Sequence, residues 1–407
     1  MKATAEFIKF LVLQKNTFMI RFITSFLIPA FLLAISSCST GQEPVTGAAR
    51  FDQYNKLISG KSIAVVANQT SMVGNAHLVD TLIAKGMNIK VIFAPEHGLR
   101  NMADAGETIE SGKDTKTGIT VTSLYGSHLK PTPEDLAGID YVIFDIQDVG
   151  ARFYTYISTL NYILEACAEN NVACIVLDRP NPNGFYFDGN ILDTAYSSFV
   201  GMNPVPIVHG MTVGEYARML NGEGWLKGGV KCSLTVIPCL NYTHGTYYTL
   251  PVRPSPNLPN QNSIYLYPSI CFFEGTSLSL GRGTSTPFQV YGSPLLPDRG
   301  FSFTPQSVAG AKNPPLLGEK CYGVDLSRAI QNGIVPKPQL NLELIINAYN
   351  DFPEKEKFFT SYFEKLAGGT TLREQIQQGL TAEQIRESWK PGLEAFGKIR
   401  QKYLLYK

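Results

Sequence analysis

The stretch IKVIFAPEHGLR, residues 89–100, decides the predicted fold. It opens with a short run rich in β-branched and aromatic side chains and ends with an acid, an imidazole, a glycine and a guanidinium between Glu96 and Arg100. Nearly continuous apolarity over so short a run is typical of a strand that is buried on both faces, as in a parallel sheet covered by helices. The polar residues would then follow the carboxyl end of the strand, where open parallel sheets bind their ligands.

Further apolar runs alternate with helical stretches between residues 62 and 210. Gly86 ends the helical pattern of residues 76–86, a second helix is expected over residues 156–171, and Thr212-x-x-Glu215 is a capping box that opens a third. This alternation predicts a doubly wound α/β domain with a mostly parallel sheet. The other runs are SIAVVAN (62–68), TVTSLY (120–125), YVIFDI (141–146), ACIVLD (173–178) and PIVHG (206–210).

The composition changes near residue 290. Before it, residues 253–263 and 278–288 are expected to form long ordered loops, because they lack the compositional bias of linkers. After it come prolines and glycines and then a helical tail with a second capping box, Thr381-x-x-Gln384. We therefore expect a catalytic domain over residues 50–290 and a smaller α+β C-terminal domain over residues 291–407.

The N-terminus has the features of an export signal. Arg21 precedes an apolar run over residues 22–34, and small residues lead to Cys38. This pattern resembles a bacterial lipoprotein signal over residues 1–38, with Cys38 as the lipidated residue. The sequence therefore predicts an exported protein that is anchored by lipid in the bacterial cell envelope, in the periplasm or at the outer membrane, with residues 39–49 as a flexible tether.

Charge and missing motifs exclude several functions. The formal net charge is +1, from 35 basic and 34 acidic residues without a long run of one sign, so nucleic acid is not expected as a partner. The sequence contains neither GxGxxG nor GxxxxGK[ST], and neither GxSxG nor HExxH. We therefore expect no cofactor, and the sequence lacks the motifs that would identify a dinucleotide-binding enzyme, a serine hydrolase or a zincin.

Polar side chains follow all of the predicted strands, and carboxylates are prominent among them. Glycoside hydrolysis needs a protonated carboxyl beside the leaving oxygen and usually a second carboxylate. Glu96 is the best candidate for the acid, because Pro95 and Gly98 would bend the chain around it. The second carboxylate stays open among Asp148, Asp178 and Glu274; His97 and His209 are candidate orienting residues, and Arg152 and Arg282 are candidate clamps for a substrate carboxylate.

Two other functions stay open for the same residues. A non-catalytic glycan-binding lipoprotein could use this edge of the sheet without an ionisable group at the strand tip. A metal-dependent hydrolase could assemble a hard-ion site from Glu96, His97, Asp148 and His209. The six cysteines that follow Cys38 form no CxxC pair, so no structural zinc site is expected.

The ordered set of motifs resembles the bacterial exo-β-N-acetylmuramidase family from about residue 50 to the end of the chain. Among the matching motifs are NQTS (68–71), APEHGLR (94–100), ADAGE (103–107), SLYG (123–126), FDIQDVGARFYTY (144–156), LDRPNP (177–182), HGMTVGE (209–215), RPSPNLP (253–259), FFEGT (272–276) and SLGRGT (279–284).

The resemblance implies a Rossmann-like catalytic domain and an enzyme that removes N-acetylmuramic acid from the non-reducing end of peptidoglycan fragments. It places the catalytic glutamate at Glu96, and it implies substrate contacts from Asn68, His97, Tyr125, Asp148, Arg152 and Arg282. Relatives typically have glycine after EHGLR, where this chain has Asn101. Since muramic acid carries a lactyl carboxylate, we expect Arg152 or Arg282 to bind that group.

Overall fold

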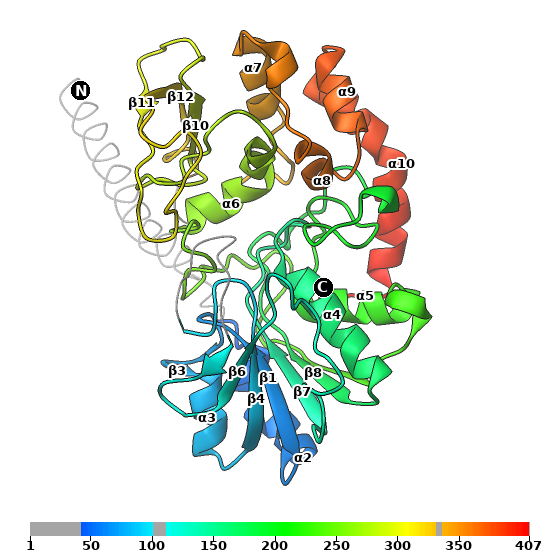
Figure 1. Cartoon of the computed structure of the whole chain (residues 1–407). Helices are drawn as coiled ribbons and strands as arrows, with labels where there is room; N and C mark the ends of the chain where they lie inside the picture. The colour runs from blue at the N-terminus through cyan, green and yellow to red at the C-terminus, as the bar shows by residue number, and fades with distance from the viewer. Residues whose placement is uncertain (1–41, 101–110, 331–335, 407) are drawn as a thin grey trace, which may run out of the picture. The chain divides into compact units, whose positions relative to one another are not determined.

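A seven-stranded sheet forms the centre of the fold in this computed structural model, which describes residues 42–100, 111–330 and 336–406 (Figure 1). Strand β5 pairs antiparallel with β6, and the other neighbours pair in parallel. The α/β fold with a mostly parallel sheet is thus confirmed. In spatial order the strands are β5 (Gly112–Lys113), β6 (Thr120–Ser123), β4 (Asn88–Ala94), β1 (Ser62–Ala67), β7 (Tyr141–Asp145), β8 (Ala173–Leu177) and β9 (Leu234–Ile237).

Helices cover both faces of this sheet, as the apolar strands require. In β1, Ile63 and Val65 pack with helices α2 (Phe51–Ile58) and α3 (Leu78–Ala84) on one face. The alternate residues of β1 belong to the core on the other face, which contains α4 (Tyr156–Glu169) and α5 (Val213–Glu223). Because successive side chains of a strand point to opposite faces, a strand between two helical layers must be apolar throughout.

The structure corrects one predicted strand. Residues 206–210 are not a strand, and only Val208 forms isolated bridges, to Ala151 and Asp188. This apolar run is buried as an extended segment beside the loop after β7, and burial alone does not distinguish such a segment from a strand. The parallel strand next to β8 is instead β9, which was not predicted; both capping boxes, at Thr212 and Thr381, are confirmed.

The C-terminal part combines helices with small antiparallel strands. β10 (Val290–Ser293), β12 (Cys321–Asp325) and β11 (Ser302–Phe303) pair in that order. In Figure 1, these strands and helices α7 to α9 gather away from the large sheet. The predicted boundary near residue 290 stays a prediction. The helices are α6 (Gln261–Ile270), α7 (Glu343–Asp351), α8 (Phe363–Ala367), α9 (Thr371–Gln377) and α10 (Ala382–Gln401), and short elements elsewhere are β2 (Met72–Val73), β3 (Ala76–His77) and the 3₁₀ turns Gly47–Ala49, Thr194–Tyr196, Lys227–Gly229, Cys271–Gly275 and Lys355–Lys357.

Residues 44–49, expected as part of a flexible tether, belong to the fold. The amide of Gly47 donates to the carbonyl of Asp178 at 2.8 Å, and that of Val45 donates to Leu240 at 2.9 Å. The predicted signal and Cys38 lie outside the described residues. Within residues 42–100, 111–330 and 336–406, no helix combines the length and apolarity needed to cross a membrane.

Arg152 joins the loop after β7 to the C-terminal helices. Its side chain is buried, and its two terminal nitrogens donate to four carbonyl oxygens at 2.8 to 3.1 Å. Two of these carbonyls end helix α8, where a cation also meets the negative end of the helix dipole. Burial lowers the pKa of Arg152 to about 9. The carbonyls belong to Asn190, Val205, Leu366 and Ala367.

Asp178 anchors the C-terminal tail at the carboxyl end of β8. Its buried carboxylate accepts hydrogen bonds from the Tyr406 hydroxyl at 2.6 Å and the Thr212 hydroxyl at 2.7 Å. It also accepts from the amides of Gly214 and Arg179. Burial raises the pKa of Asp178 to about 6, although the hydrogen bonds that it accepts oppose that rise.

Replacing Arg152 with methionine should lower the free energy of unfolding by roughly 2–4 kcal/mol, because buried carbonyls lose their donors. Urea unfolding of the wild type and the variant measures this loss. Arg299→Met is the matched control: its guanidinium pairs with Asp351 and is 63% exposed, so its loss should stay below about 0.5 kcal/mol. Equal losses in the two variants would contradict the assignment of Arg152 as a structural link.

Asp178 should make stability depend on pH. Its folded pKa of about 6 lies above the value of about 3.9 that aspartate has in an unfolded chain. Its contribution of about 3 kcal/mol is therefore full below about pH 4 and is lost as the pH rises through about 6, with about 2 kcal/mol of the loss between about pH 4.5 and pH 7.5. Urea unfolding between about pH 4.5 and pH 7.5 should show this fall in the wild type and a flatter profile in Asp178→Asn. The same slope in both proteins would show that another group titrates.

Candidate active site

A cavity of about 760 Å³ lies where loops from the sheet meet segments of the C-terminal part. Glu96 and His97 enter it directly after β4, and Tyr125 enters it after β6. Glu274 comes from the 3₁₀ turn after α6, and Arg282 from the loop that follows. The fold thus brings these predicted site residues into one cavity from segments far apart in the sequence.

A tight turn presents Glu96 at the end of β4. The amide of Gly98 donates to the carbonyl of Pro95 at 3.0 Å, and both His97 (φ 73°) and Gly98 (φ 82°) are left-handed. A left-handed backbone is strained for histidine, and such strain is concentrated at functional sites. Glu96 is partly exposed, and its Oε2 accepts a hydrogen bond from the Thr155 hydroxyl at 2.9 Å. The predicted bend around Glu96 is confirmed.

His97 is buried in the wall of the cavity rather than presented openly. Its Nε2 lies 3.4 Å from the hydroxyl oxygen of Ser255, in the RPSPNLP loop. One ring edge of His97 thereby holds this loop close to the Glu96 turn. The sequence left open whether His97 orients Glu96 or contacts substrate. The structure adds a third role, which is the contact with Ser255.

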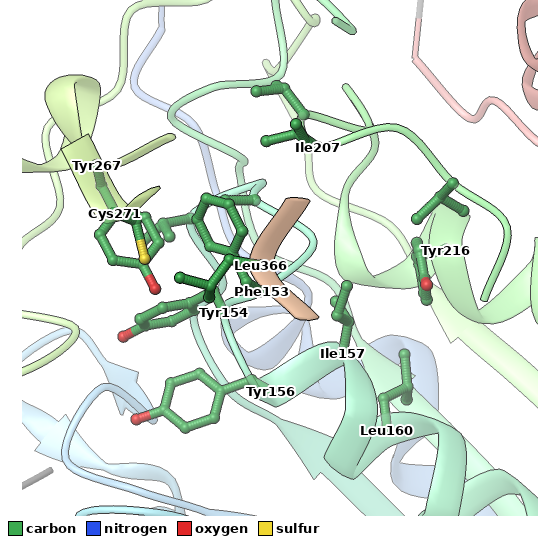
Figure 2. Packing of buried hydrophobic residues seen from close by; sticks show 14 of the residues in the cluster. Phe153, Tyr154, Tyr156, Ile157, Leu160, Ile207, Tyr216, Tyr267, Cys271 and Leu366 are labelled. Carbon is green, nitrogen blue, oxygen red and sulfur yellow. The ribbon is translucent and has the colours of Figure 1, made fainter. Parts of the chain in front are cut away.

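Two tyrosines fasten the same loop from the other side. The hydroxyls of Tyr154 and Tyr156 both donate to the carbonyl of Pro254, at 2.8 and 3.3 Å. Figure 2 shows the two rings close together with their hydroxyls directed the same way, and the ring centroids are 4.9 Å apart. Burial, reinforced by nearby carboxylates that include Glu96, raises both tyrosine pKa values well above the ordinary range, so both hydroxyls stay neutral donors.

Arg282 is held in the cavity by a carboxylate and an aromatic ring. Its Nε and Nη2 donate to Oε1 of Glu274 at 2.8 and 2.5 Å, and its guanidinium carbon lies 4.9 Å from the centre of the Phe288 ring. Burial lowers the pKa of Arg282, but the charge and hydrogen bonds of Glu274 outweigh that effect and leave it raised. The orientation of the Arg282 cation is therefore fixed by Glu274 and Phe288.

Asp148 and His209 form a buried pair that does not line the cavity. Oδ2 of Asp148 accepts from the amide of Gly150 at 2.6 Å and lies 3.6 Å from Nε2 of His209. Nδ1 of His209 accepts from the amide of Met211 at 3.2 Å, so the ring proton belongs on Nε2, facing Asp148. The pair supports the loop that leads to Tyr154.

The lining of the cavity also lacks Asn68 and Arg152, which the family resemblance implied as substrate contacts, and Asp178, a candidate for the second carboxylate. Oδ1 of Asn68 accepts from the amide and the hydroxyl of Thr70, at 2.9 and 2.5 Å, and so closes the turn after β1. Arg152 and Asp178 are committed to the structural bonds described above. All of these side chains are buried, which favours roles in building the loops around the cavity.

The sequence-based prediction missed several residues that line the cavity. Thr155, Tyr154 and Tyr156 follow Arg152 in the motif FDIQDVGARFYTY, which was used only for the family resemblance. An aromatic wall includes Tyr125 and Phe199, whose ring centroids are 6.3 Å apart. Such faces suit the apolar faces of sugar rings, and the aromatic content of 11% was the available signal. Further lining residues are Phe153, Ser255, Tyr267, Phe273, Phe288, Lys312 and Tyr362.

The hard-ion set considered from the sequence is divided in the structure. Glu96 and His97 line the cavity, whereas Asp148 and His209 are buried outside its lining. Among the described residues, no group of three or more histidine, cysteine, aspartate or glutamate side chains is arranged to hold a metal ion. Arg100, the guanidinium that ends the opening stretch, pairs with Asp80 and Asp114 at 2.7 and 2.8 Å.

Known proteins resemble this chain over nearly its whole length. The sequence models of the N-terminal and C-terminal domains of exo-beta-N-acetylmuramidase NamZ match residues 63–262 and 265–406. The peptidoglycan beta-N-acetylmuramidase NamZ of Bacillus subtilis is 38% identical over 372 residues, which cover 87% of this chain and 89% of that protein.

Solved structures agree with this match. A crystal structure of a DUF1343 family protein from Bacteroides fragilis has a TM-score of 0.84 and 48% identity, and covers 90% of this chain and 99% of that one. A second DUF1343 family protein of the same organism has a TM-score of 0.76 and 29% identity, over 89% of this chain and 99% of that one. The chain therefore belongs to the NamZ family of exo-beta-N-acetylmuramidases.

Proposed function

We propose that this protein is an exo-acting glycoside hydrolase that releases N-acetylmuramic acid from the non-reducing end of peptidoglycan fragments, with Glu96 as general acid/base. The observation that carries the proposal is Glu96 itself, a carboxyl held by a strained turn in the wall of a cavity with many aromatic side chains. The substrate class is supported by the chain's membership of the NamZ family, which includes a Bacillus subtilis relative named as a peptidoglycan beta-N-acetylmuramidase.

In the proposed reaction, protonated Glu96 donates its proton to the glycosidic oxygen as the bond from that oxygen to the anomeric carbon breaks. Glu96 then accepts a proton from the water that attacks the anomeric carbon. Among Asp148, Asp178 and Glu274, only Glu274 lines the cavity, and one of its oxygens is bound by Arg282. This arrangement favours the 2-acetamido group of the substrate as the internal nucleophile, a recognised exception to the scheme with two carboxylates.

Arg282 is the proposed ligand of the lactyl carboxylate that distinguishes muramic acid from glucosamine. Arg282 lines the cavity and donates hydrogen bonds to Glu274 through Nε and Nη2. Arg152, the other candidate from the sequence, is buried and donates to four carbonyls, so a substrate carboxylate could reach it only if those bonds broke. The geometry therefore favours Arg282.

The cellular setting is part of the same proposal. Residues 19–38 carry the pattern of a lipoprotein signal, which supports export and attachment to the membrane through lipid on Cys38. An enzyme placed there would meet muramyl saccharides of the cell wall at their source. Metabolic labelling with a fatty acid, comparing the wild type with Cys38→Ala, addresses the anchor separately from the activity.

Incubation with a disaccharide that has muramic acid at its non-reducing end, followed by chromatography, should show release of N-acetylmuramic acid by the wild type. Glu96→Gln should lose roughly 10² to 10⁴ of this rate, because glutamine cannot transfer the proton. Glu343→Gln, at an exposed position of α7, is the matched control and should keep full activity. A fragment with N-acetylglucosamine at that end should be cleaved much more slowly.

Other outcomes of this experiment identify the alternatives. If the wild type releases no N-acetylmuramic acid and Glu96→Gln binds the disaccharide as tightly as the wild type, the protein is a glycan-binding lipoprotein. Activity that EDTA abolishes and a divalent metal restores would indicate a metal-dependent hydrolase.

Replacing Arg282 with leucine should remove selectivity for muramic acid. For N-acetylmuramic acid and N-acetylglucosamine glycosides of one chromogenic aglycone, kcat/KM should fall roughly tenfold to a hundredfold more on the muramic acid glycoside, since a charged hydrogen bond is lost. Arg282→Lys keeps the charge without the planar fork and should give an intermediate loss. Equal losses on both glycosides would refute recognition of the carboxylate by Arg282.

A further inference from the structure

Thr155 occupies the start of helix α4 without capping it. Threonine in this position usually accepts a hydrogen bond from an amide of the first helical turn, which stabilises a helix by about 1 kcal/mol. Here the backbone of Thr155 is itself helical (φ −68°, ψ −10°), and its side chain makes no capping bond. The hydroxyl is directed instead to Oε2 of Glu96, at 2.9 Å.

The position of this hydroxyl is fixed by the helix and by the neighbouring residues. The carbonyl of Thr155 accepts from the amides of Ser158 and Thr159, both at 3.0 Å. The backbone of Thr155 is thereby held at the N-cap position, directly before α4. On either side of it, the hydroxyls of Tyr154 and Tyr156 are bonded to the carbonyl of Pro254. A donor with so little freedom can hold its acceptor in one orientation.

We infer that Thr155 is a positioning residue that fixes the carboxyl of Glu96 and determines which of its oxygens carries the catalytic proton. The inference rests on the proposed function of Glu96. Because the hydroxyl donates to Oε2, protonation of that oxygen would displace the bond, and the proton of the acid form belongs on Oε1.

The proposed transfer leaves the Thr155 hydroxyl chemically unchanged. The proton on Oε1 passes to the glycosidic oxygen, and the electron pair of the breaking bond to the anomeric carbon goes to that oxygen. Glu96 becomes a carboxylate, and its bond from Thr155 becomes charge-assisted and hence stronger. Thr155 thus stabilises the ionised product of the step more than the acid that begins it.

The test compares Thr155→Val with Thr155→Ser and with Thr159→Val. Valine has the shape of threonine without the hydroxyl, and serine keeps the hydroxyl. Thr159 is buried one turn further along α4, where its hydroxyl bonds to the helix carbonyl of Thr155, so Thr159→Val is a matched loss of a hydroxyl away from Glu96. The measurements are kcat and KM for release of N-acetylmuramic acid, the pH profile of kcat/KM and the midpoint of thermal unfolding.

Thr155→Val should lower kcat roughly tenfold to a hundredfold with little change in KM. Its pH profile should keep activity to higher pH on the basic side, because the ionised carboxylate has lost a donor. Thr155→Ser should restore most of the rate and the original profile. Thr159→Val should match the wild type in both.

The results that overturn the inference are distinct from those that overturn the proposed function. If the wild type is active and Glu96→Gln is not, but Thr155→Val keeps the wild-type kcat and pH profile, only the role of Thr155 fails. The same is true if Thr155→Val and Thr159→Val lose equal rate together with equal thermal stability, or if serine fails to rescue a folded protein. An inactive wild type, in contrast, removes the proposed function itself.

Discussion

One carbonyl oxygen, that of Pro254, joins the loops that surround Glu96. It accepts hydrogen bonds from the side chains of Gln69, Tyr154 and Tyr156 at 3.2, 2.8 and 3.3 Å. Gln69 lies in the loop after β1, Tyr154 in the loop after β7, and Tyr156 at the first position of α4. Pro254 follows them in the chain by 185, 100 and 98 residues. Side chains from three separate positions in the chain thus converge on one backbone oxygen, and the Glu96 turn is linked to the same loop through His97 and Ser255.

Several polar side chains at the edge of the sheet bond to the loops around the cavity and do not line it. Asp148, Asp178 and Asn68 follow strands of the sheet, and one oxygen of Asp148, one oxygen of Asn68 and both oxygens of Asp178 accept from neighbouring backbone or hydroxyl groups. Buried polar groups must be satisfied within the protein, and loops at the end of a sheet contain many unpaired amides. Polar side chains at this edge therefore help to satisfy the loops that border the cavity.

The sequence was sufficient for the central strands and for the bend at Glu96, because both depend on short local patterns. Continuous apolarity identified β1, β4, β7 and β8, and Pro95 and Gly98 identified the bend. It was not sufficient to distinguish Arg152 from Arg282. Both are arginines close to a glycine in the sequence, and only the fold shows that one meets helix carbonyls and the other a carboxylate. Thr155 was missed for the same reason, since its partner lies 59 residues earlier.

The charges in the cavity give a physical reason for the Glu274–Arg282 pair. A muramyl substrate would bring its own carboxylate into a space that already contains Glu96 and Glu274, and like charges in a partly desolvated site repel strongly. A lone arginine there would be mobile and costly to bury, whereas one held by Glu274 and Phe288 is already in place when substrate arrives. If Arg282 turned toward the lactyl group, Glu274 would keep one hydrogen bond while sharing the cation. Arg282 would then give an anionic sugar charge-assisted hydrogen bonds that offset its repulsion from Glu274, and a neutral sugar has no carboxylate to accept them.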